Sequence, residues 1–272
     1  DIINARPEKY WQKIQDSLIT IVSVSDESYL KYFKTLVLSA SKHSKNISFE
    51  VLLINIKNKK NVLDELNSLS EFIKVTFQEH AFKDKNQKQS FCANARVNFI
   101  KNLLEGGARK ILYLDADSLV RKDLQKYNWD FQDSDIEILF RESEEEEKFK
   151  FATGVMAIKN SPDTIKFFQS WDRLIQPLIF DWFADQISFY RNYKKFKNEM
   201  VFKRLSPKMI DWKFTQDSTI WVGKGNRKYR NILYRLESFK ASLTSNRARK
   251  LIEIIQNLLD KPNQQYIRIF ED

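Results

Sequence analysis

Short apolar runs alternate with helically spaced apolar residues along the first half of the chain. The runs are rich in β-branched residues, as is typical of buried strands, and they lie at 18–24, 48–55, 73–79 and 110–114. Helices with one apolar face are predicted at 7–17, 28–44, 61–70 and 90–104. This alternation predicts an α/β fold, a mostly parallel sheet flanked by helices. Ligands of such sheets bind beyond the carboxyl ends of the strands.

The second half of the chain has a less regular pattern. Strands are predicted at 136–141, 152–158, 199–205 and 218–222. Helices are predicted at 162–175, 181–191, 226–243 and 247–259. The acidic run at 142–147 predicts a solvated loop, and no internal repeat or Pro/Gly-rich linker divides the chain.

The composition indicates a globular protein with a substantial core, because 42% of the 272 residues are hydrophobic. The single cysteine, Cys92, excludes an internal disulfide framework and is compatible with a reducing compartment. No run approaches the roughly 18 consecutive apolar residues of a membrane-spanning helix, and no signal peptide is visible. Because the chain begins with Asp1 rather than Met, we expect it to be a piece of a longer protein.

The formal charge of +10 favours anionic partners such as nucleotides, phosphates or acidic membranes, although solvated basic faces would explain it equally well. The segment from Lys224 to Lys250 has nine basic residues and one acidic residue, Glu237, beside an apolar stripe. Three interpretations remain open: contact with an anionic membrane, docking on a longer chain, or a core-packed helix with a solvated basic face. We expect no nucleic-acid partner, because no stacking-aromatic motif or known module is present.

Two carboxylates, Asp115 and Asp117, follow directly after the predicted strand at 110–114. Residues two apart in an extended chain point the same way, so both carboxylates can face one point beyond the sheet. A divalent cation would relieve their repulsion, and hard cations prefer carboxylate, water and phosphate oxygens. The pattern leaves two interpretations open: a metal site for a phosphorylated substrate, or a turn in which the aspartates bond their own backbone.

Six segments, in order along the chain, resemble those of glycosyltransferase family 8, the retaining nucleotide-sugar glycosyltransferases with a GT-A fold. They are 22–44, 93–104, 109–124 (RKILYLDADSLVRKDL, the family's Asp-x-Asp segment), 151–160, 183–190 and 205–214. The resemblance implies a GT-A domain over 1–225. Its nucleotide-binding half lies at about 18–120 and its acceptor half at about 121–225, and a helical basic extension follows at 226–272.

The resemblance implies that Asp115 and Asp117 bind Mn²⁺ or Mg²⁺, which neutralises the leaving diphosphate, and that Asp115 also contacts the ribose or sugar. It implies that Asp26 bonds a nucleobase edge and that Tyr29 stacks on the base. The alternative is a helix-capping aspartate beside an aromatic residue. Arg96 would fork onto phosphate or sugar hydroxyls, and its alternative is a surface salt bridge.

Asp185 and Gln186 match the family's Asp-Gln pair and are the predicted catalytic residues. They would lie near the anomeric carbon, and either an opposite-face nucleophile or leaving-group-assisted attack would give retention. The alternative is that both merely cap the helix at 181–191. Thr153 and Gly154 match the family's small residues under the donor or acceptor sugar, where glycine permits close backbone approach.

The chain departs from the family pattern at two places. Ala152 stands where the family has asparagine, and 218–228 lacks the histidine that precedes the family's Gly-x-x-Lys-Pro-Trp motif. The third metal ligand is therefore lost or replaced, with Asp217 as a candidate. Lys224, between two glycines, is predicted to contact the diphosphate.

These observations predict a metal-dependent glycosyltransferase that moves a sugar from a nucleotide-diphosphate sugar, UDP by resemblance, to a glycan, lipid or protein hydroxyl. The alternatives are a non-catalytic nucleotide-sugar or glycan-binding module and a sugar nucleotidyltransferase. The nucleotidyltransferase is disfavoured because VSVSDESYL at 22–30 lacks glycine. We expect a cytoplasmic protein that can lie peripherally on a membrane through 224–250.

Overall fold

The computed structural model describes residues 2–3, 19–127, 129, 131, 133–141, 143–206, 208–243, 248–256 and 259. The strands are β1 (Ile2–Ile3), β2 (Ile19–Asp26), β3 (Ile47–Ile54), β4 (Ile73–Gln78), β5 (Lys110–Leu114), β6 (Ser118–Val120), β7 (Ile136–Phe140), β8 (Phe151–Lys159), β9 (Phe202–Arg204), β10 (Ile210–Asp211) and β11 (Ile220–Val222). The α-helices are α2 (Leu30–His43), α3 (Lys59–Leu69), α4 (Lys85–Asn94), α5 (Arg96–Glu105), α6 (Glu147–Lys150), α7 (Pro162–Ile175), α8 (Ala184–Phe196), α9 (Arg227–Arg230) and α10 (Ile232–Ser242). Short 3₁₀ turns lie at Leu124–Lys126 and Gln176–Leu178, and residues 248–256 are helical.

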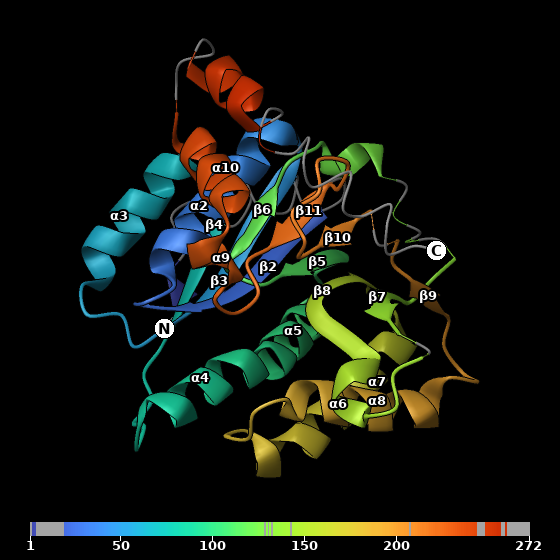
Figure 1. The fold of residues 1–272 in the computed structure, drawn as a ribbon. Coiled ribbons are helices and arrows are strands. Elements are labelled where there is room, and N and C mark those ends of the chain that lie inside the picture. Colours follow the sequence, from blue (N-terminus) through green and yellow to red (C-terminus); the bar gives the residue numbers. More distant parts are fainter. Residues whose placement is uncertain are drawn as a thin grey trace.

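An eight-stranded sheet with the order β1-β4-β3-β2-β5-β8-β7-β9 forms the centre of the molecule (Figure 1). Strands β4, β3, β2 and β5 are parallel neighbours, whereas β8 runs antiparallel to both β5 and β7. The carboxyl ends of β2 and β5 therefore meet at one edge, as parallel strands require. The predicted mostly parallel α/β fold is confirmed.

Alternating residues of the central strands pack into two separate cores, one on each face of the sheet. On β2, Ile21 faces the core shared with α2 and α3, whereas Val22 faces the core shared with α4, α5, α7 and α8. Figure 1 shows these two sets of helices on opposite sides of the sheet. Because both faces are covered, β2 and β3 are buried at nearly every position, and this is why apolar residues stand on both faces of these strands.

A second, three-stranded sheet with the order β10-β11-β6 lies beside the main one. The chain leaves β5 at Leu114, passes through Asp115 and Asp117, and enters β6 at Ser118. Strand β6 then pairs antiparallel with β11, with Ser118 opposite Val222. The apolar run that resumes after the two aspartates thus belongs to a different sheet, and the aspartates lie at the junction of the two.

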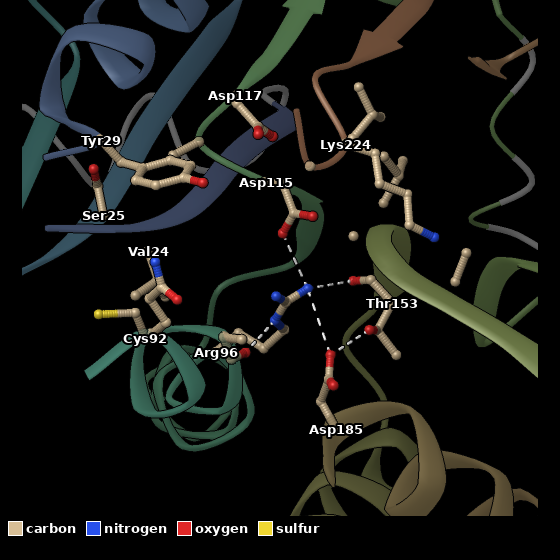
Figure 2. Close-up of a pocket in the computed structure, with 18 of the residues that line it drawn as sticks. Val24, Ser25, Tyr29, Cys92, Arg96, Asp115, Asp117, Thr153, Asp185 and Lys224 are labelled. Atoms are coloured by element: carbon tan, nitrogen blue, oxygen red, sulfur yellow. Dashed lines mark hydrogen bonds and ion pairs between the residues drawn. The ribbon is translucent and has the colours of Figure 1, made fainter. Parts of the chain in front are cut away.

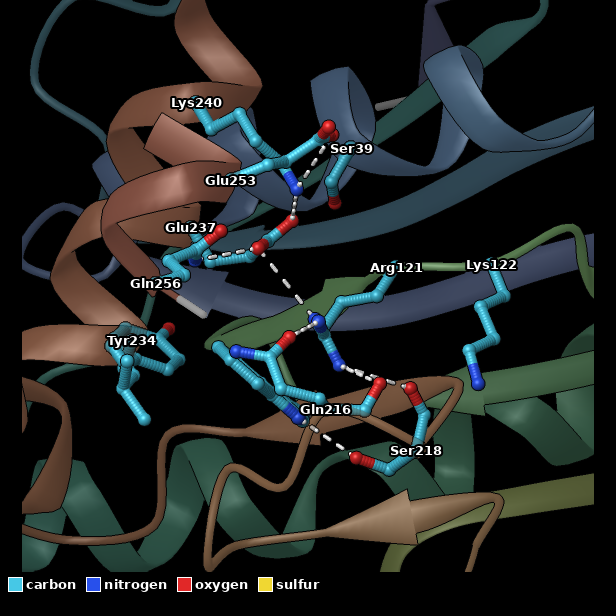
Figure 3. Close-up of polar contacts among 12 residues, drawn as sticks. Ser39, Arg121, Lys122, Gln216, Ser218, Tyr234, Glu237, Lys240, Glu253 and Gln256 are labelled. Carbon is cyan, nitrogen blue, oxygen red and sulfur yellow. Dashed lines mark hydrogen bonds and ion pairs between the residues drawn. The ribbon is translucent and has the colours of Figure 1, made fainter. Parts of the chain in front are cut away.

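The basic C-terminal segment packs on the rest of the molecule through buried charged groups. Helix α10 lies against α2. The carboxylate of Glu237 is 3.6 Å from the Nε atom of Arg121 and 2.9 Å from the Nζ atom of Lys240 (Figure 3). Gln256, in the helix at 248–256, donates to the same carboxylate at 2.8 Å. This supports the interpretation of a core-packed helix for the described part of the segment.

Some predicted elements differ from the structure. The helix predicted at 90–104 begins earlier and is two helices, α4 and α5, because the carbonyl of Ala93 accepts from the side chain of Arg96. The helix predicted at 226–243 is interrupted at Asn231, whose side chain caps α10. Helix α8 begins at Ala184 rather than at 181, because Phe183 has a left-handed backbone with φ 67°. The acidic run ends in the short helix α6.

Other predicted elements agree with the structure within a few residues at each end, as for α7 and β5. The helix predicted at 7–17 lies outside the described residues. No helix of the described part of the chain is long and apolar enough to cross a membrane.

Candidate active site

A cavity of about 660 Å³ lies at the carboxyl ends of β2 and β5, where the fold predicts a ligand site. Every residue predicted to bind or act on the donor lines it: Asp26, Tyr29, Arg96, Asp115, Asp117, Thr153, Gly154, Asp185, Gln186 and Lys224. These residues come from distant parts of the sequence, so the tertiary fold brings them together. Their individual roles stay predictions.

The Arg96 guanidinium lies at the base of the cavity and joins three segments (Figure 2). Its NH1 atom is 3.0 Å from a carboxylate oxygen of Asp115, 3.0 Å from the carbonyl of Thr153, and 3.8 Å from the carboxylate of Asp185. The alternative of a surface salt bridge is wrong, because Arg96 is buried. Burial opposes its charge, but Asp115 outweighs that effect and raises the pKa of Arg96.

Asp115 combines a cationic partner with an open face. About 31% of its side-chain surface is exposed. The buried Tyr113 hydroxyl lies 3.3 Å from the same oxygen that Arg96 contacts. The surrounding protein, together with the neighbouring charges of Asp117 and Asp185, raises the pKa of Asp115, although Arg96 opposes this. Arg96 therefore holds Asp115 in place at the cavity wall.

Gly154 makes room for Asp115. Strand β8 pairs with β5, and the Asp115 amide donates to the Gly154 carbonyl at 2.9 Å. A Cβ atom on residue 154 would stand 2.3 Å from the Oδ2 atom of Asp115, far inside van der Waals contact. Glycine fits here because of the close approach of Asp115, whereas the predicted close approach to a donor or acceptor sugar stays a prediction.

Asp185 lies in the first turn of α8 and is buried. Its carboxylate accepts the Thr153 hydroxyl at 2.5 Å, and its backbone amide donates to the Asn94 side chain at 3.1 Å. The carboxylate thus points across to β8 rather than capping its own helix. The Gln186 amide, in the orientation that satisfies its neighbours, donates to the carbonyls of Lys148 and Phe151 at 2.8 and 2.7 Å.

Lys228, on α9, is the partner of Asp117. Its Nζ atom is 2.7 Å from the Oδ2 atom of Asp117 and 2.7 Å from the Tyr29 hydroxyl. The Lys228 side chain is 1% exposed and the Asp117 side chain 9%. Burial disfavours the ammonium, but Asp117 overcomes this and raises the pKa of Lys228. The backbone carbonyl of Asp117 also accepts the buried Tyr234 hydroxyl at 2.7 Å.

Asp26 and Tyr29 end β2 and begin the turn into α2. The carboxylate of Asp26 accepts the Tyr29 amide at 3.0 Å and the Ser28 hydroxyl at 2.7 Å, and it pairs with Lys88 at 2.7 Å. Burial opposes ionisation, yet Lys88 and Ser28 lower the pKa of Asp26 overall. Asp26 therefore stabilises the turn that precedes α2, whose N-cap is Tyr29 without a side-chain capping bond, and both residues also line the cavity.

Lys224 follows β11 and stands at the opposite wall of the cavity from Tyr29 (Figure 2). Its Nζ atom lies 5.5 Å from the centre of the Trp212 ring. Burial, with nearby Arg141, lowers the pKa of Lys224. Among the described residues, no carboxylate forms an ion pair with it, so its charge is available to a ligand.

The residues present do not fit the Mn²⁺ or Mg²⁺ that the resemblance implies. Asp115 and Asp117 each have a buried cationic partner already, Arg96 and Lys228. The described residues contain no group of three or more His, Cys, Asp or Glu side chains placed to hold a metal ion. Asp217, the candidate third ligand, is exposed and lies outside the cavity lining.

Sequence reasoning missed Lys228, which holds Asp117. A signal was present, because Lys228 stands three residues after Gly225 and so repeats the Gly-x-x-Lys spacing of the family motif. Trp182 and Trp212 were also missed. Both line the cavity, and Trp182 is 58% exposed.

Comparison with known proteins gives the same picture. The family model for glycosyl transferase family 8 matches residues 20–169, which is more than half of the chain. No curated protein matches the sequence significantly. The family match agrees with the resemblance carried by the Asp-x-Asp segment and its neighbours.

Among the solved structures that share the fold are those of two glycosyltransferases. The glycosyltransferase GlyE of Streptococcus pneumoniae TIGR4 superposes with a TM-score of 0.60 at 15% identity, over 91% of this chain and 64% of GlyE. The galactosyltransferase LgtC, solved in complex with donor and acceptor sugar analogs, superposes with a TM-score of 0.58 at 17% identity, over 85% of this chain and 99% of LgtC. The chain therefore spans less than two thirds of the length of GlyE.

Proposed function

Because this chain belongs to glycosyl transferase family 8, we propose that it transfers a sugar from a UDP-sugar to a hydroxyl group of a glycan, lipid or protein, with retention at the anomeric carbon. One observation carries the proposal beyond the family. The cavity at the ends of β2 and β5 is lined by all ten residues that the resemblance assigned to donor binding, metal binding and catalysis.

The donor would lie across the cavity from β2 to α8. The nucleoside fits beside Tyr29 and Asp26 at the end of β2, where ligands of parallel sheets bind. The diphosphate fits beside Lys224, because that ammonium faces the cavity without a carboxylate partner among the described residues. The sugar then falls between Asp115 and Asp185, whose oxygens suit its hydroxyl groups.

Asp185 would stabilise the positive charge that develops at the anomeric carbon as the leaving group departs. Glycosyl transfer passes through an oxocarbenium-like state, and a fixed carboxylate in a water-poor site is effective there. The Asp185 carboxylate already accepts the Thr153 hydroxyl and lies near Arg96, which favours electrostatic stabilisation over nucleophilic attack. Retention then follows by attack from the face that the diphosphate leaves.

Thermal unfolding with UDP, GDP and CDP tests donor binding. A ligand at about 100 times its Kd stabilises the folded state by about 2.7 kcal/mol, and we expect this with UDP. Asp185→Asn should keep UDP binding and lose transfer. Asp163→Asn, on the exposed start of α7, is the matched control. The proposal fails if no nucleoside diphosphate raises the melting temperature, either with or without Mn²⁺, and a panel of sugar donors is neither hydrolysed nor transferred under the same conditions.

We also propose that the predicted division stands, with the nucleotide half at about 18–120 and the acceptor half at about 121–225. Helix α9, at the start of the predicted extension, contributes to the site because it supplies Lys228 to Asp117. Peripheral membrane contact through 224–250 is a further proposal, supported by the exposed Tyr229, Ile232 and Phe239 among basic residues. Sedimentation with vesicles containing phosphatidylserine tests it, and equal binding to neutral vesicles would contradict the charge argument.

A further inference from the structure

The residues around Lys228 provide both a counter-charge and aromatic faces for its buried ammonium group. Besides its contacts with Asp117 and the Tyr29 hydroxyl, its Nζ atom lies 4.2 Å from the Tyr29 ring centre, 5.2 Å from that of Tyr32 and 5.5 Å from that of Tyr229. Aromatic faces attract cations, most strongly when the cation is desolvated. A carboxylate and three tyrosine rings therefore hold this ammonium in the interior, directly behind the cavity wall.

The backbone around this ion pair is equally constrained. The Gly223 amide donates to the Asp117 carbonyl at 3.0 Å. A Cβ atom on Gly223 would lie 3.0 Å from that carbonyl oxygen, from the Cβ atom of Lys228 and from the hydroxyl of Tyr234. Strand β11 and α9 thus fit closely against Asp117, and the Lys228 side chain between them is buried.

Strand β11 also ends beside the aspartate pair without supplying a ligand. Its last residue, Val222, lines the cavity and pairs with Ser118, next to Asp117. An isopropyl side chain cannot coordinate a metal ion. The end of β11 is therefore apolar, and the charge that balances Asp117 comes from Lys228.

We propose that this enzyme binds its nucleoside diphosphate without a divalent cation. Lys228 balances the charge of Asp117 from inside the protein, Arg96 does so for Asp115, and Lys224 contacts the diphosphate from the cavity wall. The inference rests on the proposed function, since it concerns the same nucleotide. Lys228 acts through Asp117 and Tyr29 and is a positioning residue, whereas Lys224 touches the ligand.

The unmodified protein gives the first test. Metal is removed with EDTA, and UDP binding is measured by calorimetry in EDTA, in Mg²⁺ and in Mn²⁺. We expect Kd values within about threefold of each other. Binding that appears only with Mn²⁺ or Mg²⁺ overturns the inference and keeps the proposed function. Absence of binding in all three solutions overturns the proposed function, and the inference with it.

Substitution of Lys228 gives a second, independent readout. Lys228→Met leaves Asp117 without its cation, so we expect the variant to acquire Mn²⁺ binding, measured without nucleotide by the loss of the free-Mn²⁺ electron paramagnetic resonance signal. The unmodified protein and Lys195→Met, an exposed site on α8, should leave that signal unchanged. Asp117→Asn combined with Lys228→Met should abolish the acquired binding. If the unmodified protein itself binds Mn²⁺, the inference is refuted, and this result does not depend on whether the variants fold.

Discussion

Replacing Glu237 with alanine removes a buried carboxylate that Arg121, Lys240 and Gln256 share (Figure 3). The Glu237 side chain is 3% exposed, so Arg121 and Lys240 would lose the buried counter-charge that they share. Removing one partner of a buried ion pair typically lowers the free energy of unfolding by about 3–5 kcal/mol. At about 2–4 °C for each kcal/mol in a chain of this size, the melting temperature should fall by roughly 6–20 °C.

The same carboxylate gives a pH dependence whose sign follows from its pKa. Burial acts to raise the pKa of Glu237, but Lys240 and Arg121 outweigh it, so the pKa lies below its usual range in the folded state. Its contribution to stability is therefore complete above the unfolded-state pKa of about 4.3 and is lost as the pH falls through the folded-state pKa. Urea unfolding should show that the unmodified protein and Glu237→Gln differ less in their free energy of unfolding at pH 4 than at pH 7.

A surface glutamate provides the control for this prediction. Glu79 pairs with Lys59 at 2.9 Å but is 59% exposed, so Glu79→Ala should change the free energy of unfolding by less than about 0.5 kcal/mol. The reasoning is refuted if Glu237→Ala melts within 1 °C or so of the unmodified protein, or if the gap for Glu237→Gln is the same at both pH values. Either result would mean that the C-terminal helices do not dock through Glu237 in solution.

Three further outcomes follow from the structure. Gly154→Ala forces the Asp115 carboxylate to move, because the added Cβ would stand 2.3 Å from it, and should lower kcat for donor hydrolysis at least about tenfold with an unchanged circular dichroism spectrum. Trp182→Ala removes an exposed aromatic face at the cavity and should raise KM for the acceptor, measured at saturating donor, without changing KM for the donor. Asp172→Asn should lower the free energy of unfolding at pH 7 by about 1–3 kcal/mol and by less at pH 3. Burial opposes the Asp172 charge, but the hydrogen bond from Lys101 at 2.6 Å lowers its pKa. An equal loss at both pH values would contradict that explanation.

Local pattern was sufficient for most of the fold. Strand β5 was predicted with its observed limits, as was α7, and the family resemblance was confirmed by the match over residues 20–169. The sequence pattern did not predict the interruptions within two of the helices. Ala95 favours helix, and the break there coincides with a hydrogen bond from the Arg96 side chain to the Ala93 carbonyl, which no periodicity reveals. Asn231, by contrast, was a visible capping residue at the break before α10.

The sequence by itself determined which residues could carry the chemistry, because strand ends, glycines and an Asp-x-Asp pair are local features. Only the tertiary structure decided their partners. Lys228 lies 111 positions from Asp117, and Glu237 stands alone as an acid in a basic segment, yet both are buried in ion pairs. The sequence gives the charge of each side chain, but the distance to its counter-charge depends on how the two sheets and the C-terminal helices pack. For Asp115 and Asp117, that packing brings Arg96 and Lys228 against the carboxylates to which the resemblance assigned a metal.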